Sequence, residues 1–118
     1  MASLTEISQM LRAFSEDRKS LKEHNTPEKI IKLLKQEVQE TEESLQDSTN
    51  LPSEIADLII FSLTLANLHG INIEEEVLTK IAFNMARYQA SDFNGDYEEA
   101  RLKGKAREEW VKPMFYND

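Results

Sequence analysis

The 118-residue sequence has no cysteine, only three glycines and three prolines, and no long hydrophobic run. The lack of cysteine excludes disulfides and thiolate zinc sites. So few turn-forming residues disfavour an all-β fold. The first residues, MASLTEISQMLRAF, lack the apolar core of a secretory signal. The most hydrophobic run, residues 58–68, is shorter than the roughly 20 residues that a helix needs to cross a bilayer. We therefore expect an all-α protein in the cytoplasm, with no membrane partner.

Acidic side chains outnumber basic ones by 22 to 14, which gives a net charge of −8. This balance disfavours binding to nucleic-acid backbones, and we expect no nucleic-acid partner. It is compatible with binding hard metal cations. The length fits one main domain with a single modest core.

Apolar residues recur at helical spacing along the chain. Leu4, Ile7 and Leu11 begin one stripe and predict a helix over residues 4–21. Thr26 before Pro27 predicts an N-cap and the first residue of a second helix, to about residue 46. A third helix is expected over residues 53–69.

The third predicted helix is apolar on nearly every side, so most of its surface needs cover. A single chain of this length has too few other residues to bury that surface. The sequence therefore predicts a homo-oligomer, either a homodimer or a homotetramer. Gly70 is suited to end this helix, and a fourth helix follows to about residue 88.

The remaining residues are highly charged and interrupted by Gly104, and form a tail or an extra helix. Trp110, Phe115 and Tyr116 are candidate anchors for docking this segment. The chain thus divides into a helical domain, residues 1–90, and a C-terminal extension, residues 91–118.

Two acidic pairs stand at i, i+3 spacing on sequential helices. Glu37 and Glu40 share one side of the second predicted helix, and Glu54 and Asp57 open the third. Helical phase places Glu37 and Glu54 in line with the inward apolar stripes. Antiparallel packing of the two helices would bring all four carboxylates together.

One such pair alone is typical of a solvated helix face, but two inward pairs on adjacent helices need compensating charge. Helices two and three offer no inward base of matching phase, so divalent cations are the natural partner. Oxygen ligands favour Mg²⁺, with Mn²⁺ as a substitute. Because Mg²⁺ binds alongside substrate phosphates, the pattern points to phosphate-ester or anhydride chemistry. Lys80, Asn84 and Arg87 form a stripe at i, i+4 and i+7 that could hold phosphate oxygens, although a solvated flank explains it equally well.

The combined motif, E37-VQ-E40, E54-IA-D57 and K80-IAF-N84-MA-R87, resembles that of the MazG-like all-α nucleoside triphosphate pyrophosphohydrolases. The resemblance covers residues 4–88. It implies a four-helix core, a homo-oligomer, and cleavage of a (d)NTP to the monophosphate and pyrophosphate, including house-cleaning of non-standard dNTPs.

The resemblance also implies roles for individual residues. The four motif acids would be both metal-binding and catalytic, without indicating which is the general base. Lys80, Asn84 and Arg87 would bind the substrate. Arg18 and His24 lie where many family members carry a base-contacting aromatic, and are further candidates for substrate contacts.

Two other functions remain open on the sequence. One is a phosphoribosyl-ATP pyrophosphohydrolase-like enzyme with the same fold and cation chemistry. The other is a catalytically silent oligomeric module whose C-terminal aromatic residues bind a partner.

Overall fold

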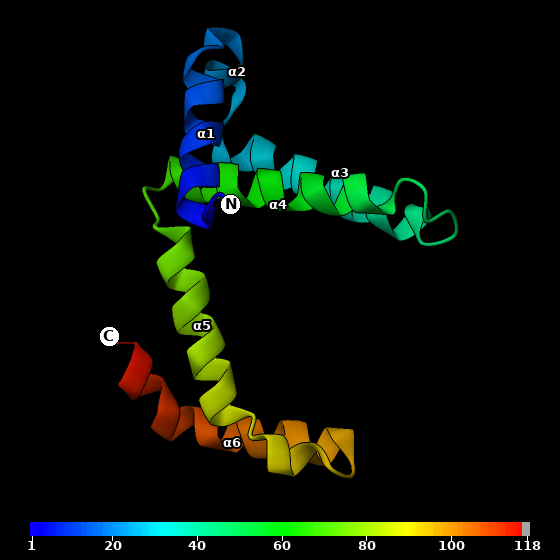
Figure 1. Ribbon diagram of the computed structural model, residues 1–118, viewed down its shortest axis with the longest axis vertical. Coiled ribbons are helices and arrows are strands. Elements are labelled where there is room, and N and C mark those ends of the chain that lie inside the picture. Colours follow the sequence, from blue (N-terminus) through cyan, green and yellow to red (C-terminus); the bar gives the residue numbers. More distant parts are fainter. Residues whose placement is uncertain (117–118) are drawn as a thin grey trace. The chain divides into compact units, whose positions relative to one another are not determined.

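The computed structural model describes residues 1–116, and these residues contain helices and no strand, which confirms the all-α prediction (Figure 1). The helices are α1 (Leu4–Glu16), α2 (Lys19–His24), α3 (Pro27–Ser44), α4 (Leu51–Leu68), α5 (Ile73–Arg87), a 3-10 turn η1 (Ala90–Phe93) and α6 (Tyr97–Phe115). The chain forms two compact units, one from Met1 to Ile73 and the other from Glu74 onward. The predicted domain boundary near residue 90 stays a prediction.

The first predicted helix is shorter than expected, because α1 ends at Glu16 and α2 begins separately at Lys19. Arg18 interrupts the helix with a non-helical backbone, at φ −125° and ψ 83°. Its guanidinium lies 3.8 Å from the centre of the Phe14 ring and donates a hydrogen bond to the Phe14 carbonyl oxygen. This contact satisfies a carbonyl in the last turn of α1, where a helix lacks internal partners. The prediction of one helix over residues 4–21 was therefore wrong.

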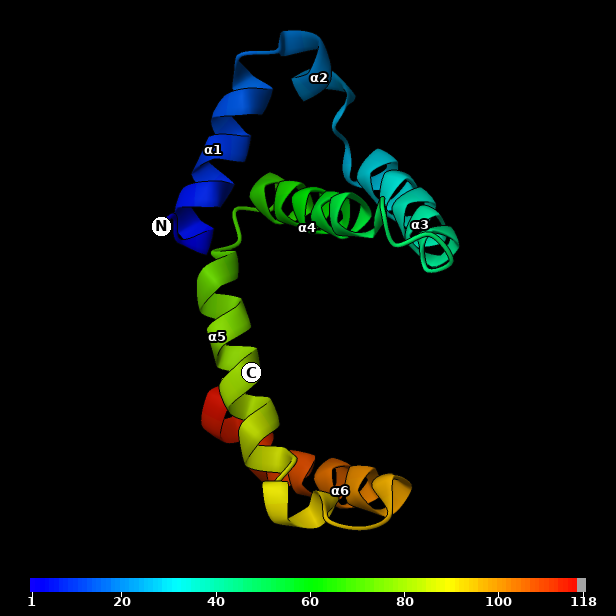
Figure 2. The same cartoon turned by 45° about the vertical axis from the view of Figure 1, so that its right-hand side comes forward.

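Helices α3 and α4 lie side by side as an antiparallel hairpin, which is the most extensive helix contact in the first unit (Figure 2). The start of α3 is as predicted: the Thr26 hydroxyl accepts a hydrogen bond from the Lys29 amide, and Pro27 follows as a first-turn residue. The buried residues of this hairpin include Ile30 of α3 and Leu63 of α4.

The end of α4 follows the predicted glycine signal. Gly70 has a positive φ of 64°, a conformation that costs other residues steric strain. The amide of Ile71 donates to the Ala66 carbonyl, and the amide of Gly70 donates to the Asn67 carbonyl. These two bonds form a Schellman motif, which caps the last free carbonyls of the helix.

Helix α4 leaves much of its apolar surface uncovered within this chain. Only Leu63 and Ala66 of its eighteen residues are buried. By length and composition, α4 is also the one helix among residues 1–116 that is apolar enough to cross a membrane. The core helix of a water-soluble protein passes the same test, so the expected absence of a membrane partner stays a prediction.

The second unit is built around Phe83 of α5, which is 1% exposed. The Phe115 and Tyr116 rings meet it edge-on, with ring centres 6.2 and 5.4 Å away. Two of the three predicted C-terminal anchors therefore dock on the chain's own core. Trp110, the third, is 73% exposed.

Gly104 does not interrupt the C-terminal segment, because α6 runs unbroken through it. The residue is buried, and a Cβ atom built on it would lie 2.2 Å from Cδ1 of Tyr88. Gly104 is thus the point of closest approach that lets α6 pack on the Tyr88 ring. The glycine that suggested a break in the sequence instead makes a contact between distant segments.

We expect Gly104→Ala to lower the free energy of unfolding by about 1–2 kcal/mol. Overpacking costs about 1–3 kcal/mol, and the higher helix propensity of alanine returns up to about 1 kcal/mol. Urea unfolding followed by circular dichroism measures the difference. Gly95→Ala is the control, since a Cβ there meets nothing within 4 Å. Equal stability of the two variants would contradict the packing role of Gly104.

Candidate functional site

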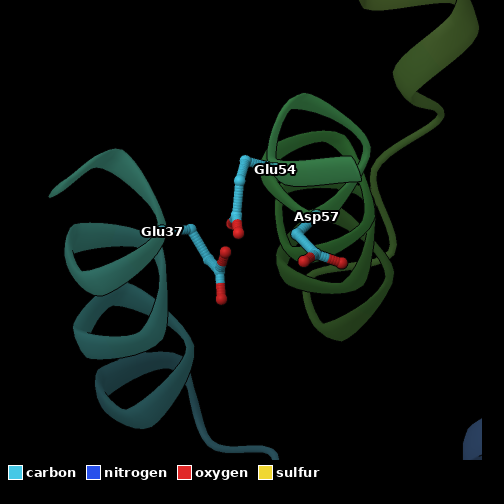
Figure 3. Close-up of side chains that lie close together, drawn as sticks. All are labelled: Glu37, Glu54 and Asp57. Atoms are coloured by element: carbon cyan, nitrogen blue, oxygen red, sulfur yellow. The ribbon is translucent and has the colours of Figure 1, made fainter. Parts of the chain in front are cut away.

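Three of the four predicted metal-binding acids come together between α3 and α4. Glu37 projects from α3, Glu54 projects from α4 toward it, and Asp57 lies beside Glu54 on α4 (Figure 3). One carboxylate oxygen of each lies within 4.8 Å of the other two. All three side chains are half-buried. The antiparallel hairpin thus juxtaposes acids from two helices, as their helical phase indicates.

Two oxygens in this group are buried without compensation. Oε2 of Glu37 and Oε2 of Glu54 are shielded from solvent and have no hydrogen-bond partner within the described residues, when both groups are ionised. Burial raises the pKa of Glu37 from 4.5 to about 7. A hydrogen bond with Glu54 and the negative charges of Glu40, Asp57 and Glu54 raise it further in the same direction. A proton shared between Glu37 and Glu54 relieves the repulsion, and a cation would do the same.

The donor set fits a hard divalent cation. All three ligands are carboxylates, which suit Mg²⁺ and Mn²⁺. A Mg²⁺–oxygen distance of about 2.1 Å lets ligands of one ion stand up to roughly 4.2 Å apart. The three carboxylate oxygens lie within 4.8 Å of one another. The unpartnered oxygens of Glu37 and Glu54 are the ones that such an ion would satisfy.

Glu40, the fourth predicted ligand, does not join this cluster. Its side chain is exposed. It lines an open, largely polar cavity of about 320 Å³ that also includes Glu54. The other lining residues are Glu43, Ser44, Asp47 and Asn50. Glu40 therefore faces solvent beside the cluster and acts on it through its charge.

The two predicted contacts in the N-terminal region have local partners. Arg18 is bound to Phe14 as described above. Nδ1 of His24 lies 3.4 Å from the Lys29 ammonium nitrogen. Both side chains are exposed, and their roles in substrate binding stay predictions.

The stripe of Lys80, Asn84 and Arg87 belongs to α5, and its members are linked to one another in the second unit. Oδ1 of Asn84 accepts hydrogen bonds from Nε and Nη2 of Arg87, at 3.1 and 2.9 Å. The Lys80 ammonium lies 4.8 Å from the centre of the Phe83 ring, and the Arg87 guanidinium lies 4.6 Å from it. One buried aromatic ring thus supports both cations.

The sequence patterns missed two residues that organise this stripe. Phe83 stands three residues after Lys80 and four before Arg87, so helical spacing was an available signal for it. Glu108 of α6 pairs with Nη1 of Arg87 at 3.0 Å. No local pattern could reveal Glu108, because the pairing joins residues on two separate helices.

Comparison with known proteins identifies the fold and its relatives. Residues 5–82, more than half of the chain, match the family described as "Phosphoribosyl-ATP pyrophosphohydrolase". The chain is also similar to a "dATP/dGTP diphosphohydrolase" of Cyanophage S-2L, with 41% identity over 49 residues, or 42% of this chain. The matched stretch spans about half of that relative, 47% of its length. No solved structure matches the chain.

The all-helical fold and the match define a protein of the MazG-like all-α pyrophosphohydrolase class, which confirms the resemblance seen in the sequence. Within that class, the chain belongs to the phosphoribosyl-ATP pyrophosphohydrolase family. The match includes Glu37, Glu54, Asp57 and Lys80, and ends before Asn84. Helix α6 lies wholly outside it.

The raised pKa of Glu37 predicts a pH-dependent stability. The folded state holds the Glu37 proton more tightly than the unfolded state, so without divalent cations the free energy of unfolding should fall as the pH rises from 4.5 to about 7. Glu37→Gln removes the charge and should gain about 1–2 kcal/mol of stability at pH of about 8. Thermal unfolding in chelator across this range measures it. Glu42→Gln, an exposed change on the same helix, should keep the wild-type profile. An unchanged profile in Glu37→Gln would contradict the assignment.

Proposed function

We propose that the protein is a Mg²⁺-dependent nucleotide pyrophosphohydrolase that converts a (d)NTP into the monophosphate and pyrophosphate. The observation that carries the proposal is the cluster of Glu37, Glu54 and Asp57, which holds two buried, unpartnered oxygens. The family match and the similarity to a dATP/dGTP diphosphohydrolase support the same reaction class. Among nucleotides, the similarity makes purine deoxynucleoside triphosphates the first candidates.

The reaction is an in-line displacement at the α-phosphorus. The oxygen of a water molecule forms a bond to phosphorus, and the bond from the α-phosphorus to the bridging α–β oxygen breaks. Pyrophosphate departs with that oxygen, and the water proton passes to a base.

The chain offers carboxylates that would hold Mg²⁺ and two cationic side chains that would contact the phosphates. When bound, Mg²⁺ would neutralise the phosphate charge and polarise the phosphoryl group. Glu37, Glu54 and Asp57 would hold it on two helices whose packing fixes the ligand positions. Lys80 and Arg87 would stabilise the charge that develops on departing pyrophosphate.

A second candidate substrate is phosphoribosyl-ATP, because the matched family carries that name. It too would be cleaved between the α- and β-phosphates, so the same acids and cations serve. A silent binding module is less favoured, since such a module would gain nothing from holding repelling carboxylates together.

We expect pyrophosphate release from at least one member of a panel of dNTPs, NTPs and phosphoribosyl-ATP in the presence of Mg²⁺. Reaction in ¹⁸O-labelled water should place the label in the nucleoside monophosphate, because attack occurs at the α-phosphorus. Phosphate-specific detection and mass spectrometry measure both products. Competition between phosphoribosyl-ATP and the best dNTP ranks the two candidates.

Glu54→Gln and Asp57→Asn should each lower the rate by about 100-fold or more, since each removes a ligand charge. Glu42→Gln is the matched control and should retain full activity. Release of orthophosphate instead of pyrophosphate would refute the assigned bond. Turnover that persists in excess chelator would refute the metal requirement.

We also propose that the chain assembles as a homodimer or homotetramer through α4. Ile55, Ile59 and Ile60 are between 39 and 52% exposed in the single chain. Their exposure leaves apolar surface that a second copy can cover. Sedimentation equilibrium should give two or four times the 13.6 kDa chain mass. Ile59→Glu should shift the protein toward monomer, and a purely monomeric wild type would overturn the proposal.

A further inference from the structure

Arg87 is a largely enclosed cation of the second unit, with 14% of its side chain exposed. The carbon of its guanidinium lies 4.6 Å from the Phe83 ring centre and 4.5 Å from the Tyr88 ring centre. Asn84 holds one edge of the guanidinium through Nε and Nη2. Glu108 accepts from Nη1 at 3.0 Å. Two aromatic rings, an amide and a carboxylate therefore fix the group in position and orientation.

These contacts do not use all of the hydrogen-bonding capacity of Arg87. A guanidinium has five N–H groups. Asn84 takes two and Glu108 takes one. One N–H on each terminal nitrogen has no partner within residues 1–116. Two N–H groups on neighbouring nitrogens form the fork that binds a phosphate through two oxygens.

Helix α6 has several docking contacts besides the Glu108 ion pair. The helix is already held by Phe115 and Tyr116 on Phe83, and by the close approach of Gly104 to Tyr88. Arg107 adds an ion pair with Asp92 and a hydrogen bond of 3.1 Å to the Arg87 carbonyl oxygen. Glu108 is 40% exposed and contributes one contact, which is to the end of the Arg87 side chain.

We propose that Glu108 is a positioning residue, which holds the Arg87 guanidinium so that its two remaining N–H groups can bind the oxygens of pyrophosphate. This inference rests on the proposed function. It assigns a role in the reaction to α6, which lies outside the family match. The contact fixes where the positive charge sits before substrate arrives, so less conformational freedom is lost when phosphate binds.

Glu108→Gln tests the role, with Glu109→Gln as the matched control. Glu109 is the next residue, is exposed, and makes no ion pair within the described chain. We expect Glu108→Gln to weaken product inhibition by magnesium pyrophosphate about fivefold and to lower kcat by a similar factor, the effect of an ion pair worth up to about 1 kcal/mol. Glu108→Asp should recover part of the loss. Glu109→Gln should match the wild type.

A double-mutant cycle separates positioning from a purely structural contact. In the Arg87→Lys background, Glu108→Gln should add little, because the group that it positions is gone. Thermal unfolding of each variant reports folding independently of these constants. Equal pyrophosphate inhibition in Glu108→Gln and Glu109→Gln would overturn the inference. Tighter inhibition in Glu108→Gln would also overturn it, since Glu108 would then be a competitor of phosphate. An inactive wild type on every nucleotide would overturn both this inference and the proposed function.

Discussion

Repulsion between carboxylates that packing holds together is the constraint on which the first unit depends. The hairpin of α3 and α4 buries one oxygen of Glu37 and one of Glu54 without a hydrogen-bond partner in the described residues. These unpaired oxygens destabilise the folded hairpin, and binding of a proton or a cation removes that destabilisation. Stability of the empty hairpin and affinity for a cation are therefore opposing properties of the same three side chains. A protein that relaxed the acids outward would be more stable and would bind a cation less tightly.

In the second unit the enclosed charge is positive, because it is the guanidinium of Arg87. Phe83 and Tyr88 supply ring faces to Arg87, and Asn84 and Glu108 supply acceptors. Rings provide attraction without a full negative charge, so most of the positive charge stays available to a phosphate. One carboxylate is enough to orient the fork. This arrangement uses a helix beyond the family match, so the proposed phosphate-binding stripe is built partly from the C-terminal segment of this chain.

Much of the first unit could be predicted from sequence, because its determinants are local. Thr26 with Pro27, and Gly70, mark helix ends through backbone chemistry that operates within a few residues. The inward phase of Glu37 and Glu54 follows from helical periodicity alone. The break at Arg18 could not be predicted, because no glycine or proline marks it in the sequence. The roles of Gly104 and Glu108 depend on contacts between α5 and α6, which periodicity does not encode. Glu40 shares a helix face with Glu37, but Glu40 is exposed and Glu37 is half-buried, a difference that periodicity does not predict.

The connection between α3 and α4 has a consequence for how such chains can change over time. Glu37 lies on α3, and Glu54 and Asp57 lie three residues apart on α4. Residues 45–50 connect the two helices. An extra residue within α3 between Glu37 and its end leaves Glu37 in place but rotates everything after it by about 100° relative to the preceding face. An extra residue in the connection rotates nothing. Insertions and deletions compatible with the site should therefore accumulate in residues 45–50, so the length of this loop can vary while the spacing of Glu54 and Asp57 stays fixed.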